Sequence, residues 1–553
     1  MKMNKKKRFC NNDYITEWRH IITAFPSIAR LPVAFLLTLV AMNLPFTCKA
    51  IDEWETKKID RRVSDYAFKG IDLSTPLDYY LSRAYVLSEG KMGLMAKMST
   101  AKFELDTCAT DEVVDTAKRQ RILDEKIVKI VIYKDSVAAI VTEYGDWLIF
   151  SYTWIENGKW VNGGQGMAEN MEEIDKQLKE NMPTLYCDLP RIKAITTLPT
   201  DTKPFVDYLK QQTLSPEEFV FQLIAIHRLV INGEYHRRKV SWDMLRRLIS
   251  QPDFSSVCGT IFMELPSREQ PTMDIFMETD KLNGELIMDI FRNEQINGWW
   301  DKGEYDFICD VWQINKHLPQ EKRINIRLVD FQIPYSQIQT AEEFRAATDA
   351  AENRNTHMAD VVERYINTKT DTRGSLFLVG CGHAYKSSMA GFASAGGDGK
   401  EDMTAGAQLA QRLGSQNVFT VFQHVMPCDN SGGHLSFIRG GVFDQAFAEN
   451  GNSPVGFLLE DSPFGKEPFD GIYDIKYKNG TGTYQDNFDG YLFLCPLNEE
   501  PQSEPLLDVF SDQFVAEIQR RSAYMDWDGR QETMFGYKVS ELTKEKIHQA
   551  LSK

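Results

Sequence analysis

The chain has few cysteines, and their spacing assigns them no common task. Nine cysteines are distributed singly over 553 residues. No CxxC pair or other metal-ligand spacing is present among them. An odd number of scattered cysteines argues against a disulfide framework, although one or two bridges would be compatible with an exported chain. The cysteines therefore do not predict a structural zinc site.

Positive charge is also scarce. The formal net charge is −16, and because residues 1–50 carry eight Lys and Arg against two acidic residues, the rest of the chain stands near −22. A protein without an excess of Lys and Arg cannot neutralise a phosphate backbone, so we expect no nucleic-acid partner. An apolar fraction of 42% and an aromatic fraction of 11% are typical of a globular protein.

Long hydrophobic runs are absent except near the N-terminus. A basic stretch at 5–8 precedes an apolar run at 31–46, and residues 48–50 offer small residues for cleavage. The run has about 16 residues, fewer than the roughly 20 that a membrane-spanning helix needs. We expect residues 1–50 to be a signal peptide and the protein to be exported, to the periplasm or beyond. An uncleaved anchor, or lipidation at Cys48, would instead hold it at a membrane.

Residues 51–182 have the pattern of a small α+β domain. Apolar residues at helical spacing over 77–98 precede four β-type segments with turn signals between them: 126–133, 136–144, 147–156 and 159–162. The closing segments loosely resemble the last strands of the nuclear transport factor 2-like (SnoaL-like) fold. Four prolines between 182 and 204 then predict a linker at 183–214.

Residues 215–553 predict a larger α/β domain. A helix is expected to begin at Ser215-Pro216, an N-cap followed by a first-turn proline. Helical stretches at 242–250 and 341–367 alternate with short apolar runs. The expected strands are 228–232, 257–263, 325–331, 376–379, 418–422 and 491–494. Strands separated by helices favour a mainly parallel sheet covered by helices.

Two copies of Gly-x-x-His follow strands of this expected sheet. The first is Gly233-Glu-Tyr-His236 and the second is Gly380-Cys-Gly-His383. The carboxyl ends of parallel strands meet at one edge of a sheet, where open α/β folds bind their ligands. Each histidine can act as a base or a metal ligand, or it can simply cap the helix that follows.

Two carboxylates end neighbouring runs. Glu264 closes the run Thr260-Ile-Phe-Met, and Asp330 closes Ile326-Arg-Leu-Val. A carboxylate that leaves a buried strand has to be solvated, paired or metal-bound, because burying it alone is costly. The alternative for Glu264 is a salt bridge to Arg237 or Arg238, and for Asp330 a structural ion pair.

Two histidines and one glutamate allow two chemistries. His236, Glu264 and His383 are a common ligand set for one catalytic divalent metal such as zinc. The same groups can act without metal, with a histidine that a glutamate orients and that deprotonates water. Either arrangement requires the three side chains to lie within bonding reach of one another.

Two further residues are weaker candidates for substrate contacts. Arg354, on an expected helix, can bind a substrate anion or pair with acidic neighbours. Trp300 can line a cleft or belong to the core.

The order of these motifs resembles the erythromycin esterase and ChaN-like superfamily, with the TraB and Tiki proteases as distant relatives. The resemblance covers roughly residues 215–500. It rests on Gly233-Glu-Tyr-His236, Glu264, Arg354-Asn-x-x-Met358-Ala359 and Gly380-Cys-Gly-His383-Ala384.

The branches of this superfamily imply different activities. The esterase branch implies that His236 is the base that opens an ester without metal, that Glu234 or Glu264 orients it, and that His383 supports the transition state. The Tiki branch implies a divalent metal at the same positions and peptide hydrolysis. The ChaN branch implies a lipid-anchored protein that binds haem.

We therefore expect an exported hydrolase with a His/Glu/His site, for an ester or lactone in the first place. A metal-dependent peptidase and a haem- or small-ligand-binding protein are the alternatives. The expected partner is a small-molecule or peptide substrate, contacted by Arg354, Tyr235, Asp330 and Trp300.

Overall fold

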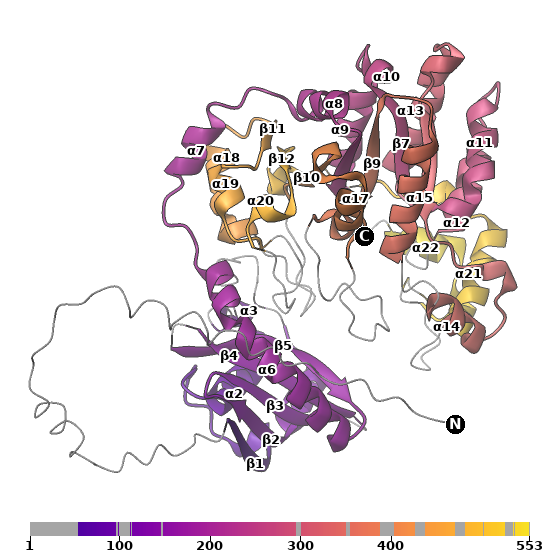
Figure 1. The fold of residues 1–553 in the computed structure, drawn as a ribbon. Helices are drawn as coiled ribbons and strands as arrows, with labels where there is room; N and C mark the ends of the chain where they lie inside the picture. The colour runs from indigo at the N-terminus through magenta and orange to yellow at the C-terminus, as the bar shows by residue number, and fades with distance from the viewer. Residues whose placement is uncertain are drawn as a thin grey trace, which may run out of the picture. The chain divides into compact units, whose positions relative to one another are not determined.

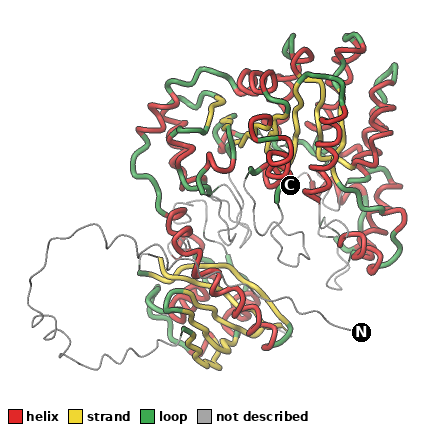
Figure 2. Tube along the Cα trace, in the orientation of Figure 1, coloured by secondary structure: helices red, strands yellow, loops and turns green. Residues whose placement is uncertain are grey.

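The computed structural model describes residues 53–551 with several gaps, and the expected signal peptide lies outside them. The gaps are 96–97, 99–110, 112, 145–146, 157, 295–299, 350–353, 387–402, 426–436, 471–481, 502, 526–532, 534 and 536. The described strands fall into two sheets, one of five and one of seven strands (Figure 2).

The first sheet is antiparallel and has the order β1-β2-β3-β4-β5. Its strands are β1 (Trp54–Arg62), β2 (Lys126–Tyr133), β3 (Val137–Tyr144), β4 (Trp147–Glu156) and β5 (Lys159–Ala168). Four of the five follow the segments expected from the sequence. The fifth, β1, was missed because only Trp54 and Ile59 of its nine residues are partly buried and the rest are exposed.

Both faces of this sheet are covered by helices. Ile174, Leu178, Met182 and Leu185 recur at helical spacing along α6 (Met171–Thr196) and pack on one face. The other face contacts α2 (Pro76–Ser88) and α5 (Thr116–Asp124), and a short α3 (Met92–Met95) follows α2. Alternate residues of β2 enter the two cores, as the two-residue period of a strand requires.

The expected linker at 183–214 is largely helical. Helix α6 continues through Pro183 and Pro190 to Thr196, and α7 (Lys203–Leu209) follows. Proline removes a backbone donor inside a helix and usually ends it. Here the apolar stripe of α6 extends past Pro183 to Leu185, so packing against the sheet compensates for the lost hydrogen bond.

The second sheet has the order β11-β12-β10-β6-β9-β7-β8, in which only β11 is antiparallel to its neighbour (Figure 1). Its strands are β6 (Leu229–Glu234), β7 (Cys258–Pro266), β8 (Asn325–Asp330), β9 (Gly374–Gly380), β10 (Val418–Gln423), β11 (Val455–Leu458) and β12 (Gly490–Phe493). The expected α/β fold with a mainly parallel sheet is confirmed. Only β11 was not anticipated.

Helices cover both faces of the parallel sheet. One core includes Val230 and Leu376 together with side chains of α8, α9, α12 and α13, and the other includes Ile231 and Phe377 with side chains of α15, α17 and α18. The helices from α8 onwards are α8 (Pro216–Ile226), α9 (Lys239–Ile249), α10 (Phe254–Val257), α11 (Gln270–Glu278), α12 (Gly284–Arg292), α13 (Lys302–Lys316), α14 (Ala341–Asp349), α15 (Arg354–Thr368), α16 (Cys381–Ala384), α17 (Ala405–Leu413), α18 (Val442–Glu449), α19 (Pro463–Lys466), α20 (Tyr484–Asn487), α21 (Asp512–Tyr524) and α22 (Lys544–Leu551). The helix expected at 341–367 is two helices, α14 and α15. Among the described residues, none of these helices is both long and apolar enough to cross a bilayer.

The strand order brings the predicted site residues to one edge. Strands β6, β9, β7 and β8 are successive neighbours, and all four are parallel. Their carboxyl ends carry Glu234, Gly380, Glu264 and Asp330 in that spatial order. Side chains that are distant in the sequence therefore lie side by side.

The start of α8 offers a test of the local sequence signals. The Ser215 hydroxyl accepts from the Glu218 amide at 3.2 Å, and the Glu218 carboxylate accepts from the Ser215 amide at 2.9 Å. We expect Ser215→Ala to lower the free energy of unfolding by about 1 kcal/mol, because a helix-end donor loses its partner. Thr200→Ala, in an exposed segment, should change it by less than about 0.5 kcal/mol. Urea unfolding measures both, and equal effects would contradict the capping role.

Candidate functional site

A buried cluster of charged and imidazole side chains occupies the carboxyl edge of the parallel sheet. Glu264, from β7, accepts a hydrogen bond from the Gly380 amide at 2.6 Å through Oε2. Its other oxygen, Oε1, lies 3.6 Å from His383 Nε2. A Cβ atom at Gly380 would lie 2.8 Å from His236 Nε2 and 3.3 Å from Glu264 Oε2, so the three segments meet at that glycine. The structure thus brings His236, Glu264 and His383 together.

Arg354, the first residue of α15, holds the cluster together. Its Nε and Nη2 donate to the two oxygens of Asp330 at 2.7 and 2.8 Å. Nη2 also donates to Glu264 Oε1, and Nη1 lies 3.1 Å from His383 Nε2. Glu264 and Asp330 are therefore both paired with one guanidinium, and not with Arg237 or Arg238. Asp330 therefore forms a structural ion pair, which was the alternative expected for it.

The ionisation of Glu264 follows from this pairing. Burial works to raise the pKa of Glu264, but the Arg354 charge and the Gly380 N–H outweigh burial and lower that pKa to about 2. The carboxylate is therefore ionised at neutral pH. Because only 7% of the Glu264 side chain is exposed, its charge depends on these partners and not on water.

The tautomer of His383 is fixed by Asn355. The Asn355 side-chain oxygen accepts from the Ala405 amide at 3.0 Å and lies 2.8 Å from His383 Nδ1. A backbone amide only donates, so this atom is an acceptor and Nδ1 carries the imidazole proton. The lone pair of Nε2 then faces the Arg354 Nη1 donor. Burial, opposed only in part by Glu264, lowers the pKa of His383 to about 4, so the ring is neutral at pH 7.

His236 is arranged differently. Its Nδ1 lies 2.8 Å from Glu234 Oε1, and its side chain is 23% exposed, whereas that of Glu234 is 7% exposed. Burial works to lower the pKa of His236, but the Glu234 and Glu264 carboxylates outweigh it and raise that pKa. Because Glu234 accepts a hydrogen bond from Nδ1–H, the neutral ring carries its lone pair at Nε2. His236 is thus the more exposed of the two histidines, since 9% of the His383 side chain is exposed.

The two remaining predicted residues, Tyr235 and Trp300, pack on apolar cores. Tyr235 is partly buried and packs on the sheet core that includes Ile231. Trp300 is buried, donates through Nε1 to the Phe291 carbonyl at 3.0 Å, and packs on Phe510 and Phe514. Trp300 is therefore part of the core, which was the alternative expected for this residue.

Asn355 was missed as a functional residue, although it lies inside the quoted Arg354-Asn motif. Its role depends on contacts with the segments 381–384 and 404–405, which the sequence does not place beside it.

The expected metal fits this geometry poorly. Glu264 Oε1 and His383 Nε2 both face the Arg354 guanidinium. A divalent cation bound there would have to displace the Arg354 guanidinium. Otherwise two positive charges would lie side by side in a buried site, which is costly. His236 is the only one of the three expected ligands that Arg354 does not contact among the described residues.

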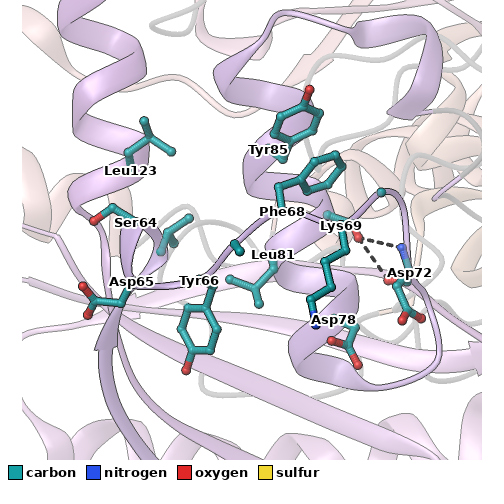
Figure 3. A pocket seen from close by; sticks show the side chains of 14 residues that line it. Ser64, Asp65, Tyr66, Phe68, Lys69, Asp72, Asp78, Leu81, Tyr85 and Leu123 are labelled. Atoms are coloured by element: carbon teal, nitrogen blue, oxygen red, sulfur yellow. Dashed lines mark hydrogen bonds between the residues drawn. The ribbon is translucent and has the colours of Figure 1, made fainter.

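A separate pocket of about 540 Å³ lies in the small domain (Figure 3). Phe68 stacks on Tyr85 at 3.4 Å between ring centroids, and Ser82 binds the backbone of Asp72. The described residues that line the pocket include no histidine or cysteine. The pocket therefore holds none of the groups that were expected to carry out hydrolysis.

Comparison with known proteins gives structural matches only. No protein-family model matches the chain, and no curated protein does. Similar solved structures include an erythromycin esterase mutant in its open conformation, at 12% identity and a TM-score of 0.36, which covers 56% of this chain and 98% of that one. A succinoglycan biosynthesis protein matches at 12% identity and a TM-score of 0.37, over 55% and 96%. Haem-bound ChaN of Campylobacter jejuni matches at 15% identity and a TM-score of 0.25, over 40% and 89%. Among solved structures the chain is thus similar to an erythromycin esterase and to ChaN, at 12–15% identity.

The Arg354 network predicts a large cost for its removal. We expect Arg354→Ala to lower the free energy of unfolding by about 3–5 kcal/mol, because Glu264 and Asp330 would remain buried without a counter-charge. Arg354→Lys should cost less, since it keeps the positive charge but loses the bidentate contact with Asp330. Arg412→Ala, which removes a more exposed pair with Asp360, should cost about 1 kcal/mol or less. Chemical unfolding at pH 7 measures all three, and similar values for Arg354→Ala and Arg412→Ala would refute the central role of Arg354.

Proposed function

We propose that this chain is a hydrolase of esters or lactones that activates water with the Glu234–His236 pair and needs no metal. The observation that carries the proposal is the 2.8 Å contact between His236 Nδ1 and Glu234, which leaves Nε2 as the basic atom at a partly exposed position. A carboxylate that holds an imidazole in one tautomer is the arrangement by which histidine takes a proton from a nucleophile.

The reaction would proceed through one proton transfer and one addition. His236 Nε2 removes a proton from water while the water oxygen attacks the ester carbonyl carbon. The carbonyl oxygen gains negative charge and needs a donor in a site of low polarity.

Arg354 is suited to that task. A guanidinium has five N–H donors. Two of them bind Asp330, one binds Glu264 and one binds His383 among the described residues. The second N–H of Nη1 is left to bind the developing oxyanion, and 25% of the side chain is exposed to receive it.

His383 acts in this scheme by positioning Arg354. Its Nδ1 proton is donated to Asn355 and its Nε2 lone pair accepts from Arg354, so the neutral ring sets the direction of the guanidinium. This replaces the role in transition-state support that the resemblance implied for His383 itself.

Haem fits the surroundings less well than a neutral ester does. Its propionate groups require basic side chains, whereas Glu234, Glu264 and Asp330 bring an excess of carboxylates to this edge of the sheet.

The proposal also includes export of the protein. That part depends on residues 1–50, which have the pattern of a signal peptide. The proposed partner is a small ester or lactone, with neither nucleic acid nor membrane needed for the chemistry.

The pH dependence of hydrolysis tests the role of His236. A base acts in its neutral form, so kcat/KM should rise with pH through a pKa above the ordinary histidine value of 6.5. In Glu234→Gln the carboxylate that raises this pKa is gone, so the rise should move to lower pH, with a rate about 100-fold lower or more. His236→Ala should lose at least that much, and His317→Ala should lose nothing.

Hydrolysis of p-nitrophenyl esters and of simple lactones by the full chain, with and without chelator, measures these effects. Loss of activity with chelator would refute the metal-free mechanism. A coloured protein with a haem absorption band and no hydrolysis would refute the proposed function.

A further inference from the structure

A serine and a histidine outside the Arg354 cluster contact each other at the same edge of the sheet. Ser267 directly follows the last residue of β7, and His357 lies on α15, one turn after Arg354. The Ser267 hydroxyl and His357 Nε2 are 3.0 Å apart. We propose that Ser267 is a second nucleophile of this protein, which His357 activates and which accepts the acyl group of an ester.

This contact is the only side-chain hydrogen bond of either residue in the part of the chain that the structure describes. A serine hydroxyl has one proton to donate, and here the acceptor is a ring nitrogen that can take the proton away. Ser250 differs, because its hydroxyl donates to the Arg246 carbonyl at 2.7 Å, which is not a base. A separation of about 2.6–3.2 Å between hydroxyl and base is that of an activated nucleophile.

Neighbouring residues hold the pair at the carboxyl edge of the parallel sheet. Pro266, the residue before Ser267, pairs with Asp330 of the adjacent strand. The ring of Phe331, the next residue after Asp330, packs edge-on against the His357 ring, with 5.8 Å between the ring centroids and 87° between the ring planes. Ser267 and His357 are both partly exposed at this edge, where open α/β folds bind their ligands.

The surroundings of His357 favour its neutral form, which is the form that acts as a base. The charged groups near the ring have both signs and come from β8, α15 and the turn after β7: Asp330, Asp360, Arg364 and Arg268. Burial outweighs the attraction of the two carboxylates and lowers the pKa of His357 below its ordinary value of 6.5. At pH 7 the ring can therefore accept the Ser267 proton.

The reaction at Ser267 is an acyl transfer followed by hydrolysis. Oγ attacks the carbonyl carbon of the ester, and His357 Nε2 takes the hydroxyl proton. The bond between that carbon and the leaving oxygen breaks, and the leaving oxygen departs as an alcohol with the proton from His357. Water then hydrolyses the acyl-serine, which releases the acid and restores the hydroxyl.

Labelling of the full chain with a fluorophosphonate tests the nucleophile. The reagent reacts with an activated serine: the bond between Oγ and phosphorus forms, the P–F bond breaks and fluoride leaves. Mass spectrometry should find the adduct on the peptide that contains Ser267. Ser267→Ala should remove this adduct, and His357→Gln should slow its formation by about 100-fold. Ser250→Ala, the matched control, should change nothing.

The rate of labelling against pH tests the base. Because the pKa of His357 is lowered, the rate should rise with pH through a pKa below 6.5 and be constant above pH 7. An unlabelled Ser267 in the folded, unmodified chain would overturn the proposal, and so would a rate that still rises above pH 7. Neither measurement needs a variant, so the result stands even if His357→Gln does not fold.

The second nucleophile can be separated from the hydrolase mechanism proposed above. The two bases come from different elements, His236 from the segment after β6 and His357 from α15. His236→Ala should therefore still be labelled at Ser267, and loss of labelling in that variant would contradict an independent pair. If Ser267 is labelled but the unmodified chain hydrolyses no ester, the proposed function fails and the nucleophile remains.

Discussion

The charge of Arg354 is the constraint on which the rest of the site depends. The side chains of Glu264 and Asp330 extend from neighbouring strands into a buried space. Neither carboxylate charge would be stable there without a partner. One guanidinium binds both and also sets the orientation of a neutral His383. The sheet supplies the spacing, since β7 and β8 are adjacent, and α15 supplies the cation at its first residue. Stability and the proposed chemistry therefore depend on the same four groups, and a change that damages one is expected to damage the other.

Much of this arrangement was predictable, because it follows from where strands end. Apolar runs that stop at Glu264, at Asp330 and at the two Gly-x-x-His motifs mark strand ends, and parallel strands end at one edge. The order of the strands was not needed for that prediction. Hairpins such as β2–β3, with turn residues between regular alternation, were equally clear from local sequence.

What the sequence did not reveal depends on contacts between distant segments. Trp300 looks the same in a cleft wall and in a core, and only its packing on Phe510 and Phe514 distinguishes the two. Four prolines suggested a linker, but two of them, Pro183 and Pro190, lie inside α6, whose apolar stripe continues past Pro183. Asn355 is an ordinary polar residue of a helix until the segments around it are placed. Local patterns specify elements and their ends, whereas the partner of a buried polar group is a property of the assembled fold.

The position of β9 has a consequence for how the protein folds. Strands β6 and β7 appear in the chain long before β9, yet β9 lies between them and pairs with both. The centre of the sheet therefore cannot close early from its N-terminal strands, and its formation waits for a contact of high sequence separation, which slows folding. The same late strand delivers the Gly380 amide to Glu264, and α15, which precedes it, delivers Arg354. A chain that has not yet inserted β9 lacks the Gly380 amide and His383, so the buried cluster is completed in the same step that completes the centre of the sheet.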